Sequence, residues 1–201
     1  EGKKDNAISF VRAFIDKNPA DVQALALWFA LAMEKGNAQD VIKHTQTQFN
    51  TNKTNLNLRL LLARMYSLNS QLDKTVSLLS DVEGNEASPQ AFWNLKGQAL
   101  IATNNVEDAT AFFDRWLSFY PQDKNAVLGK LLIIDSQKQF DQGLALTNKV
   151  LAKRPDAQLT LLKAYFHSRL GQAKPAWEII NSTADDVKAL PFVRGVIARL
   201  H

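Results

Sequence analysis

Several residue types and patterns are missing from this sequence of 201 residues, and each absence narrows its function. The chain has no cysteine, which excludes disulfides, thiolate nucleophiles and cysteine-ligated zinc sites. It has no run of about 18 apolar residues, so no membrane-spanning helix is expected. Its eight glycines are scattered and form no phosphate-binding loop. The compartment stays open, because a chain without cysteine fits reducing and oxidising surroundings equally.

The start of the chain, Glu1-Gly2-Lys3-Lys4, contains neither an initiator methionine nor a signal peptide. We therefore expect the sequence to be part of a longer protein, in which an export signal can lie upstream. What precedes and follows it is left open.

Charges are divided unevenly along the chain. Residues 124–201 contain 12 lysines and arginines against 6 acidic residues, whereas residues 1–123 contain 12 against 14. The simplest interpretation is that the basic residues are ordinary solvent-facing side chains. An acidic protein partner is the second interpretation, and nucleic acid is the third.

A repeat of 34 residues is the strongest positive signal. The stretch VEDATAFFDRWLSFYPQD at residues 106–123 returns as FDQGLALTNKVLAKRPDA at residues 140–157, with Pro121 aligned to Pro155. Pro19 lies 102 residues before Pro121, which is three whole periods. Such a regular spacing in helix-like segments predicts a repeat protein.

Residues that begin and end helices recur in the same register. Pro19, Pro121 and Pro155 mark one position of the repeat, and polar residues suited to helix N-caps follow this position in each repeat. They are Asp21, Asn55, Asp123, Asp156 and the pair Ser88-Pro89. Turns are expected at Lys35-Gly36-Asn37, Asn69-Ser70-Gln71, Asn104-Asn105, Lys138-Gln139 and Leu170-Gly171-Gln172, where glycine and asparagine tolerate the left-handed conformation. The predicted repeat is therefore a helix, a short turn, a second helix and another turn.

Apolar residues also form columns at this period. The second helices carry Ala38, Leu72, Val106 and Phe140 in one column, Ile8, Ile42, Val76, Thr110 and Leu144 in another, and Ile15, Phe49, Glu83, Leu117 and Leu151 in a third. These positions are four and seven residues apart and share one helix face. The first helices are apolar over half their circumference, as expected of helices packed between neighbours. Small residues recur in them at Ala63, Gly97 and Ala164.

These columns resemble the tetratricopeptide repeat (TPR) family. The third repeat matches the family pattern at Trp93, Gly97, Leu100, Ala109, Phe113 and Pro121. The second repeat keeps Ala63 and Tyr66, and the fourth keeps Gly143 and Pro155. The small-residue position is occupied by Leu131 in the fourth repeat and by Phe29 in the first, so these two repeats depart from the family pattern there.

The resemblance implies an all-α fold, a right-handed TPR-type superhelical solenoid of antiparallel helix pairs with some twelve helices. We predict one array over residues 1–201, excised from a larger bacterial multi-repeat protein. Its expected parts are the second helix of a truncated repeat at 5–20, repeats at 22–55, 56–89, 90–123, 124–156 and 157–189, and a partial terminal helix at 190–201.

No pattern in the sequence predicts catalysis, a cofactor or a metal ion. His44, His167 and His201 are not linked by any metal-ligand spacing, and Asp185-Asp186 is typical of a helix cap or a solvated pair. No nucleophile lies in a pattern with a base. The sequence therefore predicts a non-enzymatic protein with no cofactor, catalytic or metal site.

The resemblance implies a concave face lined by the first helices, which in this family holds peptides. The expected partner-binding residues are Gln23, Asn57, Arg64, Asn94, Gln98, Asn125, Gln158 and Tyr165. An equally weighted alternative is that they are merely the polar sides of amphipathic helices. The Lys-Asn, Asn, Lys-Arg clamp with which some members hold chaperone C-termini is not present, since its positions are occupied by Ala26, Ala30, Leu61, Ala91 and Leu95.

We expect a protein–protein interaction scaffold that binds a peptide or helix of a partner. The residues leave its compartment unknown, and only the family resemblance favours the bacterial cell envelope or periplasm. One alternative is a regulatory or targeting module of a protein whose catalytic domain lies outside this segment. RNA binding is less favoured, because no base-reading column recurs in the first helices. Self-association is expected through an exposed end carrying Ile8, Phe10, Val11 and Phe14.

Overall fold

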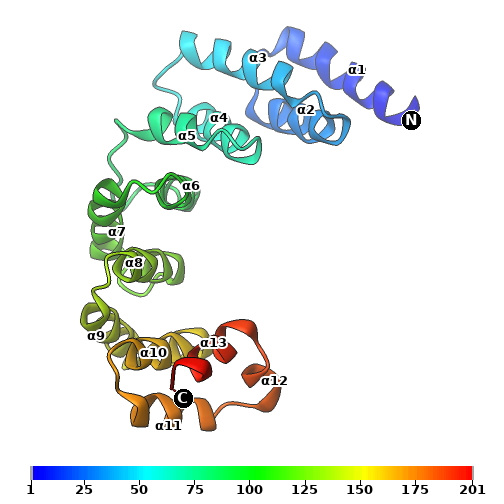
Figure 1. Ribbon diagram of the computed structural model, residues 1–201. Helices are drawn as coiled ribbons and strands as arrows, with labels where there is room; N and C mark the ends of the chain where they lie inside the picture. The colour runs from blue at the N-terminus through cyan, green and yellow to red at the C-terminus, as the bar shows by residue number, and fades with distance from the viewer. Residues whose placement is uncertain (1, 201) are drawn as a thin grey trace. The chain divides into compact units, whose positions relative to one another are not determined.

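The computed structural model describes residues 2–200, and within that range all regular structure is α-helical (Figure 1). The thirteen helices of this range are α1 (Gly2–Lys17), α2 (Val22–Lys35), α3 (Ala38–Thr51), α4 (Leu56–Leu68), α5 (Leu72–Leu79), α6 (Gln90–Ala102), α7 (Val106–Phe119), α8 (Lys124–Ser136), α9 (Phe140–Leu151), α10 (Ala157–Arg169), α11 (Ala173–Asn181), α12 (Asp185–Lys188) and α13 (Pro191–Leu200). The short helix α12 is the one that the sequence did not predict. The helices form two compact units, unit 1 with α1–α6 and unit 2 with α7–α13.

Polar N-caps begin four of the five first helices, as the sequence predicts. The carboxylate or amide oxygens of Asp21, Asn55, Asp123 and Asp156 accept hydrogen bonds of 2.7, 3.0, 2.9 and 3.0 Å from the backbone nitrogen three residues on. The prediction is wrong at Ser88-Pro89. Pro89 occupies the N-cap of α6 without a side-chain hydrogen bond, because the Ser88 hydroxyl accepts instead from the Asn85 nitrogen at 2.9 Å.

Each predicted turn between paired helices contains one left-handed residue. The φ angles are 74° at Gly36, 58° at Ser70, 54° at Asn104, 58° at Lys138 and 71° at Gly171. The turn positions are therefore confirmed. Glycine or asparagine adopts this conformation in three of the five turns, whereas Ser70 and Lys138 adopt it in the other two, which costs backbone energy.

The core of unit 1 lies between successive helix pairs. Helix α2 packs on α1, α3 and α4, and α4 packs on α5 and α6. Ala63 and Gly97 are buried at the close approaches, as predicted, and Phe29 is 5% exposed, so the first repeat packs with a large side chain in the small-residue position. On α1, Val11 is buried, contrary to the expectation that it loses its cover, because it faces α2. Phe10 remains 78% exposed.

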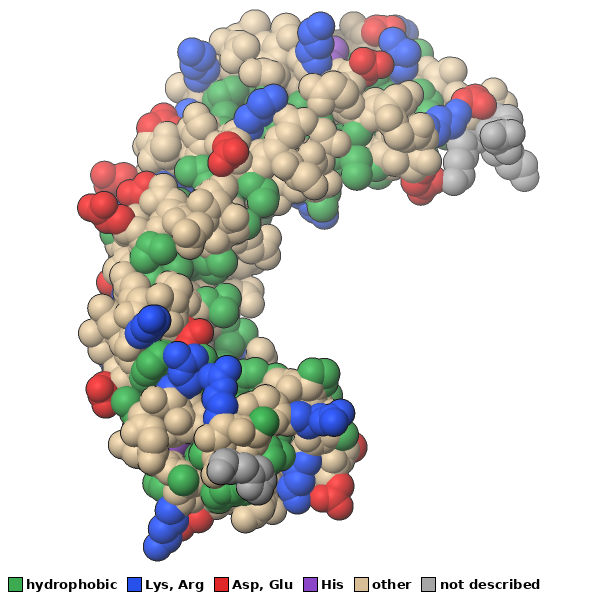
Figure 2. All heavy atoms as spheres, viewed as in Figure 1, with side chains coloured by type: hydrophobic (Ala, Val, Ile, Leu, Met, Phe, Trp, Pro, Cys, Tyr) green, Lys and Arg blue, Asp and Glu red, His purple; other side chains and the backbone are tan. Residues whose placement is uncertain are grey.

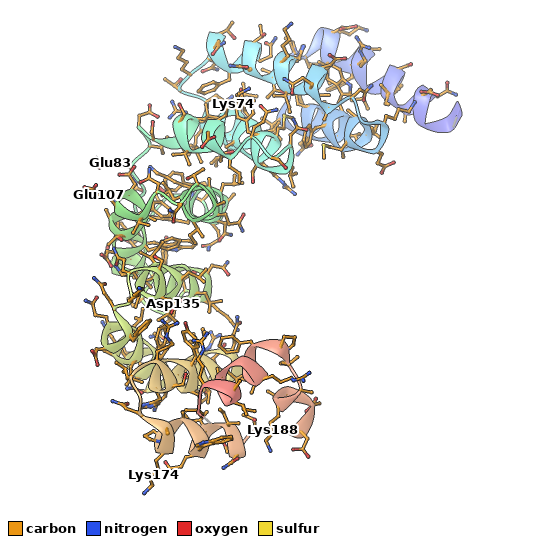
Figure 3. The ribbon with its side chains drawn as sticks, viewed as in Figure 1. Lys74, Glu83, Glu107, Asp135, Lys174 and Lys188 are labelled. Carbon is orange, nitrogen blue, oxygen red and sulfur yellow. The ribbon has the colours of Figure 1, made fainter. Side chains whose placement is uncertain are left out.

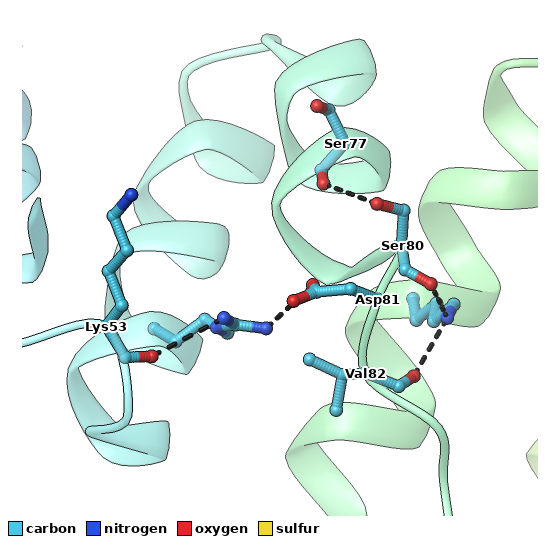
Figure 4. Close-up of polar contacts among 7 residues, drawn as sticks. Lys53, Ser77, Ser80, Asp81 and Val82 are labelled. Atoms are coloured by element: carbon cyan, nitrogen blue, oxygen red, sulfur yellow. Dashed lines mark hydrogen bonds and ion pairs between the residues drawn. The ribbon is translucent and has the colours of Figure 1, made fainter.

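Helix α5 is shorter than the repeat predicts and ends at Leu79, so Glu83 lies outside the apolar column assigned to it. Two basic side chains bind the loop that follows (Figure 4). Lys96 Nζ donates to the carbonyl oxygen of Val82 at 3.0 Å, and Arg59 donates to Asp81 Oδ1 at 2.8 Å. These contacts stabilise carbonyl and carboxylate groups at the C-terminal end of a helix, where cations are favourable.

Unit 2 packs its helices closely at two glycines. Helix α8 packs on α7 and α9, and α10 packs on α9, α11 and α13. A Cβ at Gly129 would lie 2.2 Å from the Phe113 ring, and one at Gly143 would lie 2.4 Å from the Phe166 ring. The small residue of α8 is thus Gly129, whereas Leu131 is a buried core residue, which resolves the departure seen in the fourth repeat. No helix among residues 2–200 is both long and apolar enough to cross a lipid bilayer.

Candidate functional site

Helices α8, α10 and α13 of unit 2 surround a groove of about 500 Å³. The lining residues of α8 are three, four and seven positions apart and therefore lie on one face of that helix. Those of α10 lie on one face of α10 for the same reason. The lining residues are Leu128, Leu131, Leu132, Asp135, Gln158, Leu162, Tyr165, Phe166 and Phe192. Most are apolar, and the groove therefore presents a mainly hydrophobic surface with a few polar groups, which is typical of ligand-binding sites.

The polar groups of this groove are joined through Tyr165. Its hydroxyl donates to Asp135 Oδ1 at 2.5 Å and accepts from Arg169 Nη1 at 2.8 Å, and Arg169 lies 3.9 Å from the same carboxylate (Figure 3 labels Asp135 on α8). Burial and the hydrogen bond to Asp135 raise the pKa of Tyr165. The hydroxyl therefore stays protonated. Asp135 on α8 and Arg169 on α10 both hold the ring in place, and the bond to Asp135 joins the two helices.

Helix α13 adds an aromatic and a cationic side chain to the same ring. The ring centroid of Phe192 lies 5.7 Å from that of Tyr165, and the guanidinium carbon of Arg199 lies 5.7 Å from it. Phe192 and Arg199 are seven residues apart and so share one face of α13. In Figure 2 hydrophobic and basic side chains lie side by side on the surface of unit 2, in the lower part of the view.

Two large apolar side chains of the groove are left accessible to solvent. Leu132 is 57% exposed and Phe192 is 44% exposed, whereas Leu131 beside them is 3% exposed. Covering such side chains with a partner releases water, and full burial of one is worth about 1.5–3 kcal/mol. Together they make the groove a candidate anchor site.

A second hollow of about 380 Å³ lies between α7, α8 and α9. Its lining includes Lys130, whose Nζ is 2.7 Å from Asp114 Oδ1. Two of the charged side chains that line this hollow, Lys130 and Asp114, are therefore paired with each other. The groove of α8, α10 and α13 is larger and offers exposed apolar side chains, and we regard it as the stronger candidate.

The predicted partner-binding residues are divided between the two units. Gln23, Asn57, Arg64 and Gln98 are exposed and Asn94 is partly buried in unit 1, while Asn125 is exposed in unit 2. Only Gln158 and Tyr165 are among the residues that line the groove described above. Their role in binding stays a prediction, as does that of the other six.

Sequence reasoning missed most of the groove because its walls are apolar. Leu128, Leu132 and Leu162 lie in first helices that are apolar over half their circumference, so periodicity does not separate a core leucine from a groove leucine. Phe192 was missed for another reason. It lies in the partial terminal helix predicted at 190–201, whose residues no apolar column covers, and in the structure this helix, α13, packs on α10.

The histidines and acidic pair considered from the sequence have structural partners. His44 Nε2 lies 3.2 Å from the Pro19 carbonyl oxygen, and His167 Nδ1 lies 2.6 Å from Gln172 Oε1. Asp185 pairs with Lys188 at 3.0 Å in α12. Among the described residues no three acidic or histidine side chains gather in a way that could hold a metal ion. His201 lies outside the described residues.

No protein-family model and no curated protein sequence matches the chain. Solved structures do match it. A tetratricopeptide repeat protein from Parabacteroides merdae is 17% identical with a TM-score of 0.66, covering 99% of this chain and 79% of its own. YrrB, a TPR protein with an unusual peptide-binding site, is 11% identical with a TM-score of 0.70, covering 94% and 97%.

PilW, a type IV pilus biogenesis factor, is 13% identical with a TM-score of 0.69, covering 96% of this chain and 90% of its own. At such low identities the likeness concerns the fold alone. It agrees with the helix pairs, the capped helix starts and the left-handed turns described above. The chain therefore has the all-α helical-repeat fold of the tetratricopeptide repeat proteins.

Proposed function

We propose that the chain is a protein–protein interaction scaffold and that it holds a peptide or helix of a partner protein in the groove of α8, α10 and α13. The observation that carries this proposal is the exposure of Leu132 and Phe192 beside a groove of about 500 Å³. Peptide binding by YrrB, a protein of the same fold, lends support by analogy.

The groove suits a bulky apolar anchor. Leu132 on α8 and Phe192 on α13 flank the buried ring of Phe166 and the partly buried ring of Tyr165. An inserted leucine or aromatic side chain would lose its water on several sides, and such desolvated anchors dominate the binding energy of interfaces. The network of Tyr165, Asp135 and Arg169 holds the wall rigid, which lowers the entropy lost on binding.

We also propose that this array acts within a bacterial, envelope-associated protein. The pilus biogenesis role of PilW, which shares the fold, is the supporting analogy. Fractionation of the full-length protein expressed from its own gene tests this. Recovery with envelope fractions supports the proposal, and recovery only with the soluble cytoplasmic fraction contradicts it.

The groove is tested with peptides selected on the full chain. A library of random peptides of about twelve residues is displayed on phage, and the affinity of enriched peptides is measured by fluorescence anisotropy. Leu132→Glu places a charge in the apolar wall and is expected to weaken binding at least about tenfold, a loss of about 1.4 kcal/mol.

The matched control is Leu68→Glu. Leu68 is 54% exposed, much like Leu132, but it is the last residue of α4 in unit 1. This variant should bind the peptide as the unchanged protein does, and circular dichroism should show both variants folded. Equal binding by Leu132→Glu and the unchanged protein would remove the groove as the site.

A further inference from the structure

We infer that the segment held in this groove carries an acidic side chain beside its apolar anchor, and that Arg199 binds this carboxylate. The inference rests on the proposed function, because it names the chemistry of the partner at the same groove. It is carried by the charged side chains around Tyr165. Asp135 and Arg169 have polar partners within the chain, whereas Arg199 has no carboxylate partner among the described residues.

The charge of Asp135 is already engaged by its own neighbours. Its carboxylate accepts the Tyr165 hydroxyl at 2.5 Å and lies 3.9 Å from Arg169. Arg169 in turn donates to that hydroxyl and stacks over the Phe140 ring, with 4.1 Å from its guanidinium carbon to the ring centroid. Both groups therefore serve the contact between α8, α9 and α10, and neither is available to a ligand without loss.

Arg199 is in a different position. Its side chain is exposed and its guanidinium lies over the Tyr165 ring, and among the described residues no carboxylate lies within ion-pair distance of it. The groups around Tyr165 thus comprise two guanidinium cations and one carboxylate. Because a guanidinium presents several parallel donors, a carboxylate is the ligand that it recognises best.

The position of Arg199 determines where the acid should lie. Arg199 and Phe192 are on the same face of α13, and both contact the Tyr165 ring. A partner side chain inserted beside Phe192 therefore has its neighbouring residues within reach of Arg199. The excess of basic residues in 124–201 would favour the approach of the same acidic segment from a distance.

The test is the composition of peptides selected on the full chain. On the unchanged protein, enriched peptides should pair a leucine or aromatic residue with aspartate or glutamate within about one helical turn. Replacing that acid by lysine in the best peptide should weaken its binding about five- to tenfold, as expected when an attractive contact at the edge of an interface becomes repulsive. Arg199→Glu should produce the same loss with the original peptide.

Charge exchange separates a direct contact from a change in folding. The lysine-substituted peptide should bind Arg199→Glu better than it binds the unchanged protein. Arg194→Glu is the matched control, because Arg194 is exposed on the same helix but two residues from Phe192, and so points to the opposite side. It should leave the affinity for the original peptide within about twofold, which also controls for the change in net charge.

The results distinguish failure of this inference from failure of the proposed function. Peptides that lose affinity with Leu132→Glu but show neither enriched acids nor sensitivity to Arg199→Glu would overturn the inference and keep the groove. Equal effects of Arg194→Glu and Arg199→Glu would also overturn it. Peptides that bind all variants equally would contradict the proposed site itself.

Discussion

Unit 1 and unit 2 are both stacks of helix pairs, but the second helix α5 of unit 1 and the second helix α9 of unit 2 end differently. In unit 1, α5 stops at Leu79 and a loop follows, in which Gly84 lies against Trp93. In unit 2, α9 continues without interruption to Leu151, and Gly143 within the helix allows the Phe166 ring to approach its backbone. The same repeat length therefore accommodates a large aromatic side chain either with a loop or with a helical glycine.

The units also differ in the setting of their exposed leucines. Leu68 in unit 1 ends a helix beside a left-handed turn, whereas Leu132 in unit 2 lies mid-helix on the wall of a groove. Their exposed fractions, 54% and 57%, are nearly equal. Exposure alone thus does not identify a binding surface. The proposal for Leu132 rests instead on the surrounding shape and the nearby polar network. The following variants test the comparison of the two units.

Removing one buried tryptophan from each unit should have the largest effect. Trp93 in unit 1 and Trp116 in unit 2 are fully buried, with exposed fractions of 0% and 1%. Each change to alanine should cost about 3–5 kcal/mol through lost burial and a cavity. Because repeat proteins gain stability from near neighbours, hydrogen exchange should rise first in the unit that carries the change. A uniform rise across both units would show that they unfold as one.

Adding a methyl group at one closely packed glycine of each unit, Gly143 in unit 2 and Gly84 in unit 1, should have the next largest effect. Gly143→Ala should destabilise unit 2 by about 1–3 kcal/mol, because a helix backbone and the Phe166 ring cannot both move aside. Gly84→Ala meets Trp93 as closely but lies in a loop that can shift, so its cost should be smaller. Urea unfolding of both variants measures the difference. A larger loss for Gly84→Ala would contradict this account of the loop.

The stability that a helix cap contributes should depend on pH for Asp156 in unit 2 but not for Asn55 in unit 1. Lys124, which hydrogen-bonds Asp156 at 2.8 Å, and the amide of Leu159 lower the pKa of Asp156 in unit 2. This stabilisation is present above the unfolded-state pKa of about 3.9 and is lost as pH falls through the lower folded-state pKa. Asp156→Ala should therefore cost about 1 kcal/mol at pH 7 and less toward pH 2.

The control for this cap is Asn55→Ala in unit 1, since the Asn55 amide caps α4 without a titrating group. Its cost should also be about 1 kcal/mol but should not depend on the ionisation of the cap. Thermal unfolding across this pH range gives both values. A pH-independent cost for Asp156→Ala would rule out the contribution of its lowered pKa.

Relieving the left-handed turns should have the smallest effect and should be equal in both units. Ser70 and Lys138 each adopt a φ of 58°. Changing either to glycine removes the Cβ strain but adds flexibility to the unfolded chain, for a net gain of about 0.5–1 kcal/mol. Calorimetry measures this gain. A loss of stability in either variant would show that the serine or lysine side chain makes a contact that outweighs the strain.

Much of the fold could be predicted from the sequence, because local rules fix it. Asp21, Asn55, Asp123 and Asp156 cap helices wherever they occur at this register, and Gly36 and Gly171 end helices for the same backbone reason in any fold. The shortened α5 and the added α12 could not be predicted in this way. They depend on tertiary contacts, such as those of Lys96 with the loop at Ser80 and Val82.

The candidate site was less predictable than the fold. Gln158 and Tyr165 were predicted from their register, but Leu132, Phe192 and Arg199 require knowledge of where α13 packs. The resemblance predicts polar side chains, because the backbone of a bound peptide needs hydrogen bonds. The groove instead has apolar walls with the charged groups of Asp135, Arg169 and Arg199 around Tyr165, and such a combination has no sequence period of its own.

The most direct test of the central claim is a methyl NMR spectrum of the full chain with and without a selected peptide. The account predicts shifts confined to groove leucines of unit 2, namely Leu128, Leu132 and Leu162, with the signals of Leu27 and Leu68 in unit 1 unchanged. Shifts centred on the leucines of unit 1, with those three unmoved, would contradict it.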